Sequence, residues 1–321
     1  MFYNCKGGIP INHHHSLPIE AIDTLENIQG TFPGARRAHA KGLFYKGNFT
    51  PNGKAIPYTT AAHLQNENVP VTVRFSNSPP NPASADLLTP FKGMSVQFHL
   101  ADGTASHLVS TTIPIFITKD PETFIDMLKT LTAEKTGLEK VDLGVGALTI
   151  LKKYPDRKHI AHAFKEQFKQ LPTSYAQLHY YPIHAFYFVN KEGNRQAIKY
   201  EWQPIEMEET SSQQSGASIT SPDYLSEELN NRVKKGSVSF NLIIRLGLEN
   251  DSTDDPTDAW PDDREKIVVG QLTLEEAIFP NEPILFDPTI VTKGIELTDD
   301  PILHFRHDAY AVSYSRRSKN E

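Results

Sequence analysis

The sequence predicts an α+β fold in which an antiparallel β-barrel of about eight strands is surrounded by helices. Runs of residues with high β-propensity follow one another along the chain, and several alternate apolar and polar side chains as half-buried strands do. The short polar segments 101–103 and 190–195 join neighbouring runs as tight hairpins, which makes those pairs antiparallel. Many short antiparallel strands favour a barrel.

The expected strands form two groups with a helical region between them. They are 42–49, 71–76, 94–100, 106–111 and 114–118 in the first group, and 184–189, 196–202, 237–247 and 266–274 in the second. The polar or acidic stretches 205–222 and 249–263 are expected to be surface loops. Because no repeat or dividing linker is seen, residues 1–321 are predicted to form a single domain, with 1–29 as an N-terminal arm.

Helices are expected between and after these groups. Asp120 can cap a helix that starts at Pro121, and more helix is expected between 138 and 169. The buried face of the first helix would carry Phe124, Met127, Leu128 and Leu131. The last helix follows the possible N-cap residues 298–300, has Pro301 in its first turn and ends in basic residues.

Composition limits the classes of partner. The formal net charge is −7 and the isoelectric point is about 6.0, which argues against a nucleic-acid partner and favours small molecules. No window of about 20 apolar residues occurs, so no membrane association is expected. The chain has a single cysteine, which makes the cytoplasm the default compartment. Removal of a signal peptide would instead indicate the periplasm.

The last predicted helix carries an unusual set of side chains on one face. Ile302, Arg306, Tyr310, Ser313 and Arg317 follow one another at spacings of four, four, three and four residues, which places them on one stripe. Two positive charges therefore flank a phenol. An ordinary amphipathic helix, with a packed tyrosine and solvated arginines, is the simpler alternative.

A phenol between cations is suited to binding an iron porphyrin. A cation one turn away favours the phenolate form of Tyr310, and a tyrosinate is one known axial ligand of haem iron. Haem also carries two propionates, which call for arginines. Arginines of the required kind occur in "GARRAHAKG", in "VTVRFSNS" and at Arg317.

Five segments together resemble the haem catalases in order and in spacing, from about residue 30 to residue 317. They are "RRAHAKGLFYKGNF", "VPVTVRFSNS", "FKGMSVQFHLADG", "LVSTTIPIFITKDP" and "RHDAYAVSYSRR". The resemblance implies a catalase-like barrel, haem b (iron protoporphyrin IX) as cofactor and peroxide as substrate. It also implies that His39 is the distal histidine, which moves a proton during peroxide cleavage, and that Ser76 orients its ring.

The same resemblance assigns the remaining cofactor contacts. Tyr310 matches the proximal iron ligand and Arg306 its charge partner. Haem propionates are expected to bind to three arginines, namely Arg36, Arg74 and Arg317. The resemblance places two aromatic residues in the haem pocket and at its entrance, namely Phe116 and Phe124.

The chain also departs from catalases in two ways. Where catalases have "VGNNTP", this chain has "VSTTIP", so Thr111 takes the place of a distal asparagine and is counted as a candidate catalytic residue. A hydroxyl lacks the reach of a carboxamide, so turnover of a second hydrogen peroxide should weaken. The sequence ends just past Arg317, without the segments that form the C-terminal helical domain of catalases.

These departures resemble the small catalase-related peroxidases, so the sequence predicts reduction of hydrogen peroxide or organic hydroperoxides by an external donor. The alternatives are a true catalase, a hydroperoxide rearrangement like that of allene oxide synthases, and a barrel that only carries haem. A carrier needs no oriented base, so His39 and Ser76 argue against it. A homodimer is expected slightly ahead of a monomer.

Overall fold

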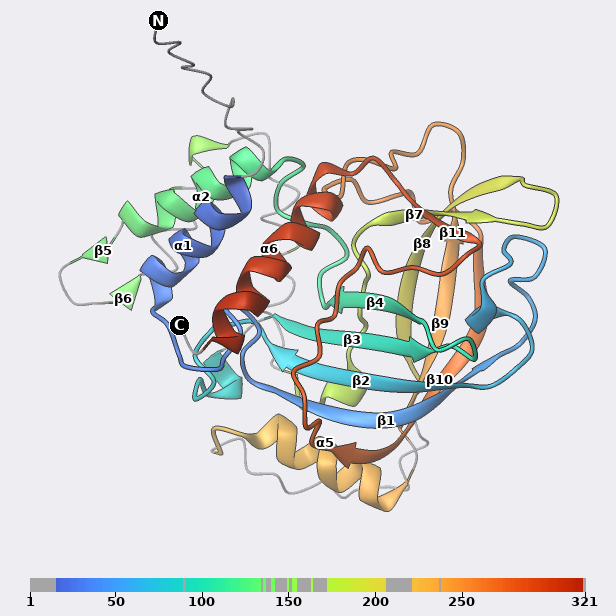
Figure 1. The fold of residues 1–321 in the computed structure, drawn as a ribbon, viewed down its shortest axis with the longest axis horizontal. Coiled ribbons are helices and arrows are strands. Elements are labelled where there is room, and N and C mark those ends of the chain that lie inside the picture. The colour runs from blue at the N-terminus through green and yellow to red at the C-terminus, as the bar shows by residue number, and fades with distance from the viewer. Residues whose placement is uncertain are drawn as a thin grey trace, which may run out of the picture.

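The structure of the protein is a computed structural model. It describes 16–88, 91–133, 172–205, 221–236 and 238–319, together with isolated short pieces between 135 and 163. Within these residues, one curled antiparallel sheet of nine strands forms the centre of the molecule (Figure 1). Its strand order is β11-β7-β8-β9-β10-β1-β2-β3-β4.

The strands fall almost entirely where the sequence predicts them. They are β1 (Gly42–Pro51), β2 (Val69–Asn77), β3 (Lys92–His99), β4 (Ala105–Thr111), β7 (Ala185–Val189), β8 (Arg195–Pro204), β9 (Val238–Leu246), β10 (Lys266–Ile278) and β11 (Ile295–Leu297). Two single bridges, Thr111 to Tyr181 and Tyr180 to Trp202, connect the end of β4 to β8 across the curl. A separate two-stranded ladder pairs β5 (Lys135–Thr136) with β6 (Lys140–Val141).

Two strand predictions need correction. Residues 114–118 form no strand, because the chain leaves the sheet after Thr111 and passes through a series of bends. There Ile113 and Ile115 pack in a small apolar cluster of their own, so an apolar run was mistaken for a strand. The three-residue strand β11 was not predicted, since so short an edge strand carries no pattern of its own.

Four helices are described outside the sheet: α1 (Leu17–Gln29), α2 (Pro121–Ala133), α5 (Tyr224–Lys235) and α6 (Pro301–Ser318). The predictions of α2 and α6 are confirmed, whereas α5 was not predicted and α1 lies in what was expected to be only an arm. Helix expected between 138 and 169 falls almost entirely outside the described residues. The loop expected at 249–263 is confirmed, and the loop expected at 205–222 lies mostly outside the described residues.

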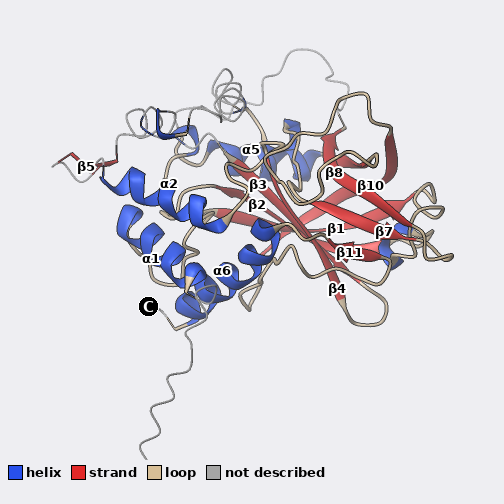
Figure 2. Ribbon diagram, turned by 90° about the horizontal axis from the view of Figure 1, so that it is seen from above, coloured by secondary structure: helices blue, strands red, loops and turns tan. Residues whose placement is uncertain are grey.

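The helices are arranged in two places around the sheet. In Figures 1 and 2, α1, α2 and α6 lie together at one side of the sheet, and α5 packs separately against β10. Apolar side chains join the three grouped helices: Ala21, Ile22, Ile125, Phe305 and Ala309. None of the helices in the described part of the chain combines the length and the apolar composition that crossing a membrane requires.

A buried histidine that packs against the sheet should make the stability of the fold sensitive to acid. His63 is 1% exposed, stacks on Phe98 with ring centroids 4.3 Å apart, and neither ring nitrogen has a hydrogen-bond partner among the described residues. Burial lowers the pKa of His63 from 6.5 to about 3. Because the unfolded chain takes up this proton below pH 6.5 and the folded chain does not, stability is lost as pH falls from 6.5 towards 3.

The expected loss due to His63 is about 2 kcal/mol between pH 7 and pH 5, at about 1.4 kcal/mol per unit below pH 6.5. Urea denaturation of the wild-type protein and of a His63→Phe variant at each pH measures it. The variant should lose about 2 kcal/mol less over this interval. Between pH 7 and pH 8 the difference in unfolding free energy between the wild type and His63→Phe should stay nearly constant, because His63 is mostly neutral in both the folded and the unfolded chain. Equal losses on acidification would contradict the prediction.

Candidate active site

Helix α6 presents the predicted proximal residues on one face. The phenolic oxygen of Tyr310 accepts two hydrogen bonds from Arg306, at 3.2 Å from Nε and 2.6 Å from Nη2. The side chains are one helical turn apart, as the spacing of four residues predicts. Two N–H groups of one cation therefore point at the oxygen that the sequence predicts to be the iron ligand.

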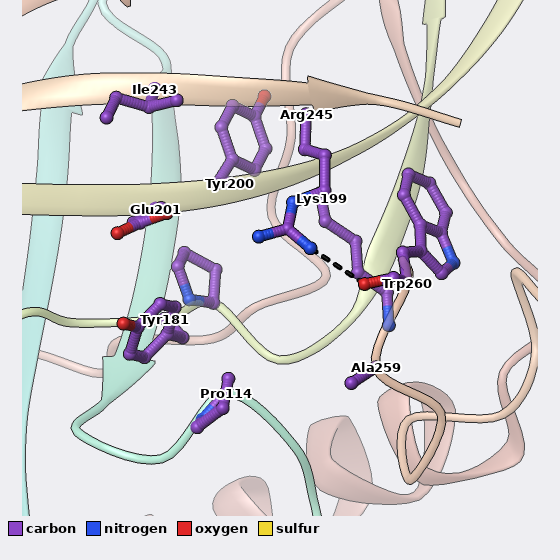
Figure 3. Close-up of a pocket in the computed structure, with 10 residues that line it drawn as sticks. Pro114, Tyr181, Lys199, Tyr200, Glu201, Ile243, Arg245, Ala259 and Trp260 are labelled. Carbon is purple, nitrogen blue, oxygen red and sulfur yellow. Dashed lines mark hydrogen bonds between the residues drawn. The ribbon is translucent and has the colours of Figure 1, made fainter. Parts of the chain in front are cut away.

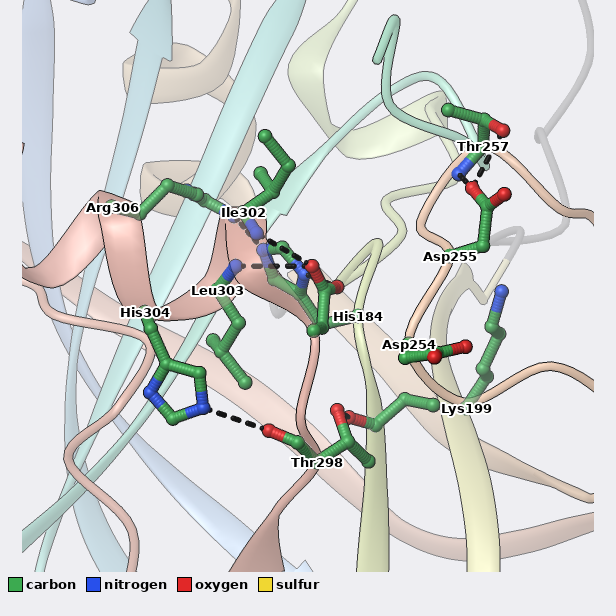
Figure 4. A network of polar contacts seen from close by, with 12 residues as sticks. His184, Lys199, Asp254, Asp255, Thr257, Thr298, Ile302, Leu303, His304 and Arg306 are labelled. Atoms are coloured by element: carbon green, nitrogen blue, oxygen red, sulfur yellow. Dashed lines mark hydrogen bonds and ion pairs between the residues drawn. The ribbon is translucent and has the colours of Figure 1, made fainter. Parts of the chain in front are cut away.

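A buried polar network holds Arg306 in place (Figure 4). Its Nη1 donates to Nε2 of His184 at 2.7 Å, and Nδ1 of His184 lies 2.6 Å from a carboxylate oxygen of Asp300. Since arginine can only donate, Nε2 of His184 accepts and Nδ1–H donates to Asp300. Burial lowers the pKa of His184 to about 4, although the bond to Asp300 opposes the shift, so the ring is neutral at pH 7.

Sequence reasoning missed the role of this network. His184 opens a predicted strand run, and Asp300 was seen only as one possible helix cap. The cap is real, because the other carboxylate oxygen accepts from the backbone N–H of Ile302 at 2.8 Å and of Leu303 at 3.2 Å. No local pattern could show that Asp300 also meets a side chain 116 positions earlier.

The predicted distal histidine meets the predicted serine. Nδ1 of His39 lies 3.0 Å from Oγ of Ser76. In the sheet, Ser76 is paired with Gly42 on one side and with Gly93 on the other, so no neighbouring side chain crowds it. A Cβ on Gly93 would lie 2.8 Å from the serine oxygen, closer than real contacts allow, and a tight 3.0 Å from Nδ1 of His39. The glycine therefore leaves room for the imidazole.

His39 is also the one described non-glycine residue with a positive φ, 55°. Such backbone is uncommon for residues with a side chain and persists where the surroundings enforce it. Here the backbone N–H of His39 donates to the carbonyl of Ser78 at 2.9 Å. Desolvation lowers the pKa of His39 to about 3, and the positive charge of Arg74 contributes further. A neutral ring whose Nδ1–H donates to Ser76 presents Nε2 as a base.

Three predicted arginines gather beside this histidine. The side chain of Arg74 donates to the carbonyls of His39 at 2.7 Å and Ala40 at 3.1 Å. Arg36 and Arg317 both donate to the carbonyl of Ile284, at 2.6 Å and 3.3 Å. Segments from both ends of the chain thus bring their guanidinium groups together.

Within the described residues, this arginine cluster has no carboxylate paired with it. Burial, together with mutual repulsion, lowers the pKa of Arg36 to about 8 and that of Arg74 to about 10. No carboxylate among the described residues forms an ion pair with Arg36, Arg74 or Arg317. The buried Nε groups of Arg74 and Arg317 have no hydrogen-bond partner there. Cations arranged in this way fit a ligand with two carboxylates, as the haem propionates would supply.

The remaining predicted residues lie on α2, in the loop before it and at the end of β4. The rings of Phe116 and Phe124 lie 5.5 Å apart, and Phe124 also contacts Phe305 of α6 edge to face, at 6.1 Å. Thr111 ends β4, where its hydroxyl donates to the backbone carbonyl of Lys92 at 3.2 Å. The hydroxyl of Thr111 therefore already has an acceptor.

A separate small recess is lined by residues of β8 and β9 and of the neighbouring loops (Figure 3). Its lining includes Tyr181, Lys199, Glu201, Arg245 and Trp260, none of which was predicted as a site residue. Burial lowers the pKa of Lys199 to about 8, and Arg245 donates to the carbonyl of Trp260 at 2.8 Å.

Comparisons with known proteins identify the family of this chain. The Catalase family model matches residues 19–320. A catalase-related peroxidase of Mycolicibacterium paratuberculosis is 34% identical over 306 residues, which cover 94% of this chain and 95% of that protein. A catalase-related peroxidase of Synechococcus elongatus is 32% identical over 313 residues, covering 94% and 89%.

A longer catalase sequence and a solved catalase structure are also similar to this chain. Catalase-2 of Bacillus subtilis is 27% identical over 293 residues, covering 86% of this chain but 42% of that protein. A bacterial catalase of known structure superimposes with a TM-score of 0.73 at 21% identity, covering 99% of this chain and 63% of the other, which confirms the predicted catalase-like fold. The family match over most of the sequence, together with the two relatives above 30% identity, shows that this chain belongs to the catalase family.

Proposed function

We propose that this protein is a haem peroxidase that reduces hydrogen peroxide or an organic hydroperoxide at the expense of an external electron donor. The observation that carries the proposal is the phenolic oxygen of Tyr310, which receives two N–H groups of Arg306 and lies on the same helix as Arg317 of the arginine cluster. The two catalase-related peroxidases support it, because they match this chain over nearly its whole length.

The cofactor proposed is haem b. Tyr310 would ligate the iron, and Arg36, Arg74 and Arg317 would bind the propionates. When bound, haem supplies the redox chemistry that cleaves a peroxide O–O bond, which an electron-rich tyrosinate ligand supports. The protein contributes the ligand, the counter-charges and the network from Arg306 through His184 to Asp300 that fixes them.

On the distal side the protein contributes a base. Nε2 of neutral His39 would accept the proton of an incoming peroxide and return it to the oxygen that leaves, so the proton is conserved. Ser76 fixes the ring orientation and the tautomer, and the low pKa of His39 keeps the basic form populated at any physiological pH. Its work is thus general acid–base catalysis.

Thr111 explains why turnover of a second hydrogen peroxide should be weak. Its hydroxyl donates to the carbonyl of Lys92, so it has no second proton to offer to a substrate. Replacing Thr111 by asparagine adds two N–H donors, so oxygen evolution from hydrogen peroxide should rise by about tenfold. A Clark electrode measures it, with Thr111→Ser as the matched control, in which no rise is expected. A Thr111→Asn variant that evolves oxygen no faster than the wild type would contradict the assignment.

Steady-state turnover with hydrogen peroxide and with an organic hydroperoxide, each with and without a phenolic donor, tests the function as a whole. Consumption that depends on the donor supports a peroxidase. Rapid oxygen evolution without donor would instead show a catalase, and oxide products of a fatty-acid hydroperoxide would show a rearrangement. The proposal also takes residues 1–321 as one haem-binding domain acting in the cytoplasm as a dimer, which cell fractionation and light scattering can check.

A further inference from the structure

One carboxylate near the end of α1 binds two arginines from opposite ends of the chain. Oε1 of Glu26 lies 2.6 Å from Nε of Arg37, and Oε2 lies 2.7 Å from Nη1 of Arg316. The second terminal nitrogen of Arg316 pairs with Asp23, one turn earlier on α1, at 2.6 Å. Both oxygens of Glu26 are therefore engaged by cations.

These two arginines adjoin the residues of the candidate active site. Arg37 lies between Arg36 and His39 on the distal segment, and its backbone N–H approaches Oγ of Ser313 on α6 at 3.5 Å. Arg316 immediately precedes Arg317, on the helix that carries Tyr310. Glu26 thus links the segment that holds the distal base to the helix that holds the proximal ligand.

Burial and charge make this link strong. The side chain of Arg37 is only 3% exposed and that of Glu26 is 19% exposed. Burial lowers the pKa of Arg317, and the positive charge of Arg37 contributes in the same direction, so the field of Arg37 reaches the arginine cluster. Removing the carboxylate would take an anion away from a buried cation that lies near other cations, which costs stability.

The position of Glu26 within α1 is unfavourable when the helix is considered alone. It precedes the last residue of α1, Gln29, by three positions, and the last turn carries no basic residue. The carboxyl end of a helix is negative and repels a carboxylate. Contacts outside the helix must offset this repulsion, and Arg37 and Arg316 are those contacts.

We infer that Glu26 is a positioning residue that holds His39 in register with Tyr310 by clamping Arg37 and Arg316. This role rests on the proposed function, since the two residues need alignment only if a ligand lies between them. Other contacts also attach α1 to its neighbours, namely the pair of Glu20 with Lys129 of α2 and the apolar cluster shared with α6. Glu20→Gln is therefore a matched control, because it removes a carboxylate and an ion pair from the same helix but not the clamp.

Hydrogen exchange of the haem-free full-length protein tests the clamp without any activity. The amides of His39 and Ala40 donate to the carbonyls of Ser78 and Pro79, at 2.9 Å and 3.0 Å. In Glu26→Gln they should exchange about tenfold faster than in the wild type, whereas in Glu20→Gln the change should stay below about twofold. Unchanged exchange at both amides in Glu26→Gln, or an equal increase in Glu20→Gln, would overturn the inference.

The haem-loaded enzyme gives a second, independent readout. Glu26→Gln should keep its haem content but react with peroxide more slowly, by about tenfold or more, because misplacement by about 1 Å can cost 100-fold. Glu20→Gln should react at the wild-type rate. If Glu26→Gln does not fold, Arg316→Gln removes one arm and leaves Arg37 paired, and a smaller increase in exchange is expected. Faster exchange in a protein that never binds haem would uphold the clamp and refute the proposed function.

Discussion

Replacing Tyr310 by phenylalanine should remove the haem, lowering the affinity for ferric haem by more than about 100-fold. Loss of partners outside the first coordination sphere of a metal already costs about 10- to 100-fold, and here the ligand atom itself is lost. The two N–H groups of Arg306 would also lose their acceptor. Titration of the haem-free protein with ferric haem, followed by absorbance, measures the change.

The matched control for this variant lies one turn further along α6. Tyr314→Phe removes a hydroxyl that makes only a long bond to the carbonyl of Pro283, at 3.4 Å. Haem content and spectrum should therefore stay as in the wild type. A Tyr310→Phe protein that bound haem with an unchanged spectrum would show that another residue ligates the iron, and would end the proposed function in its present form.

Replacing His39 by alanine should leave haem bound but slow its reaction with peroxide by about 1000-fold, since general acid–base catalysis contributes about 100- to 10,000-fold. Rapid mixing of ferric enzyme with hydrogen peroxide measures the rate constant. In the wild type, the pKa of about 3 keeps the imidazole of His39 neutral and able to accept a proton, so the rate should not fall between pH 8 and pH 5. A normal histidine, by contrast, would lose its basic form below about pH 6.5.

Ser76→Ala provides the graded comparison for this second prediction. It removes the partner at Nδ1 but keeps the base, so a smaller loss is expected than in His39→Ala. If His39→Ala reacted with peroxide as fast as the wild type, the protein would be a haem carrier in which this histidine has no kinetic role.

Much of the fold could be predicted because strands with one buried face carry an alternating pattern. The run around Ile198 became a long strand with alternating burial. The run around Arg74 alternates in sequence too and became a long strand, although both faces of β2 are buried. The error at 114–118 has a physical cause. Apolar residues that pack in a small separate cluster cannot be told from a buried strand by sequence alone. Helix α1 was missed because its polar residues serve contacts with α6 that no local pattern reveals.

The residues of the candidate site also fall into two groups, those that the local sequence indicates and those that it does not. His39, Ser76 and Tyr310 could be proposed as site residues because each lies in a short segment that resembles a catalase motif. His184, Asp300 and Glu26 could not, because each acts through a partner that the fold brings from far along the chain. An acid and a histidine in unrelated segments give no sign of a shared network until the sheet and α6 place them together.

The double use of Asp300 fixes the phase of the last helix. One carboxylate oxygen sets where α6 begins, and the other secures the histidine that supports Arg306. Tyr310 lies ten positions after Asp300, so the direction of the phenol is determined by the starting point of the helix. A single residue inserted between them would turn Tyr310 by about 100° about the helix axis, away from the arginines that share its face. This segment therefore tolerates substitutions on its outer surface but no change in length.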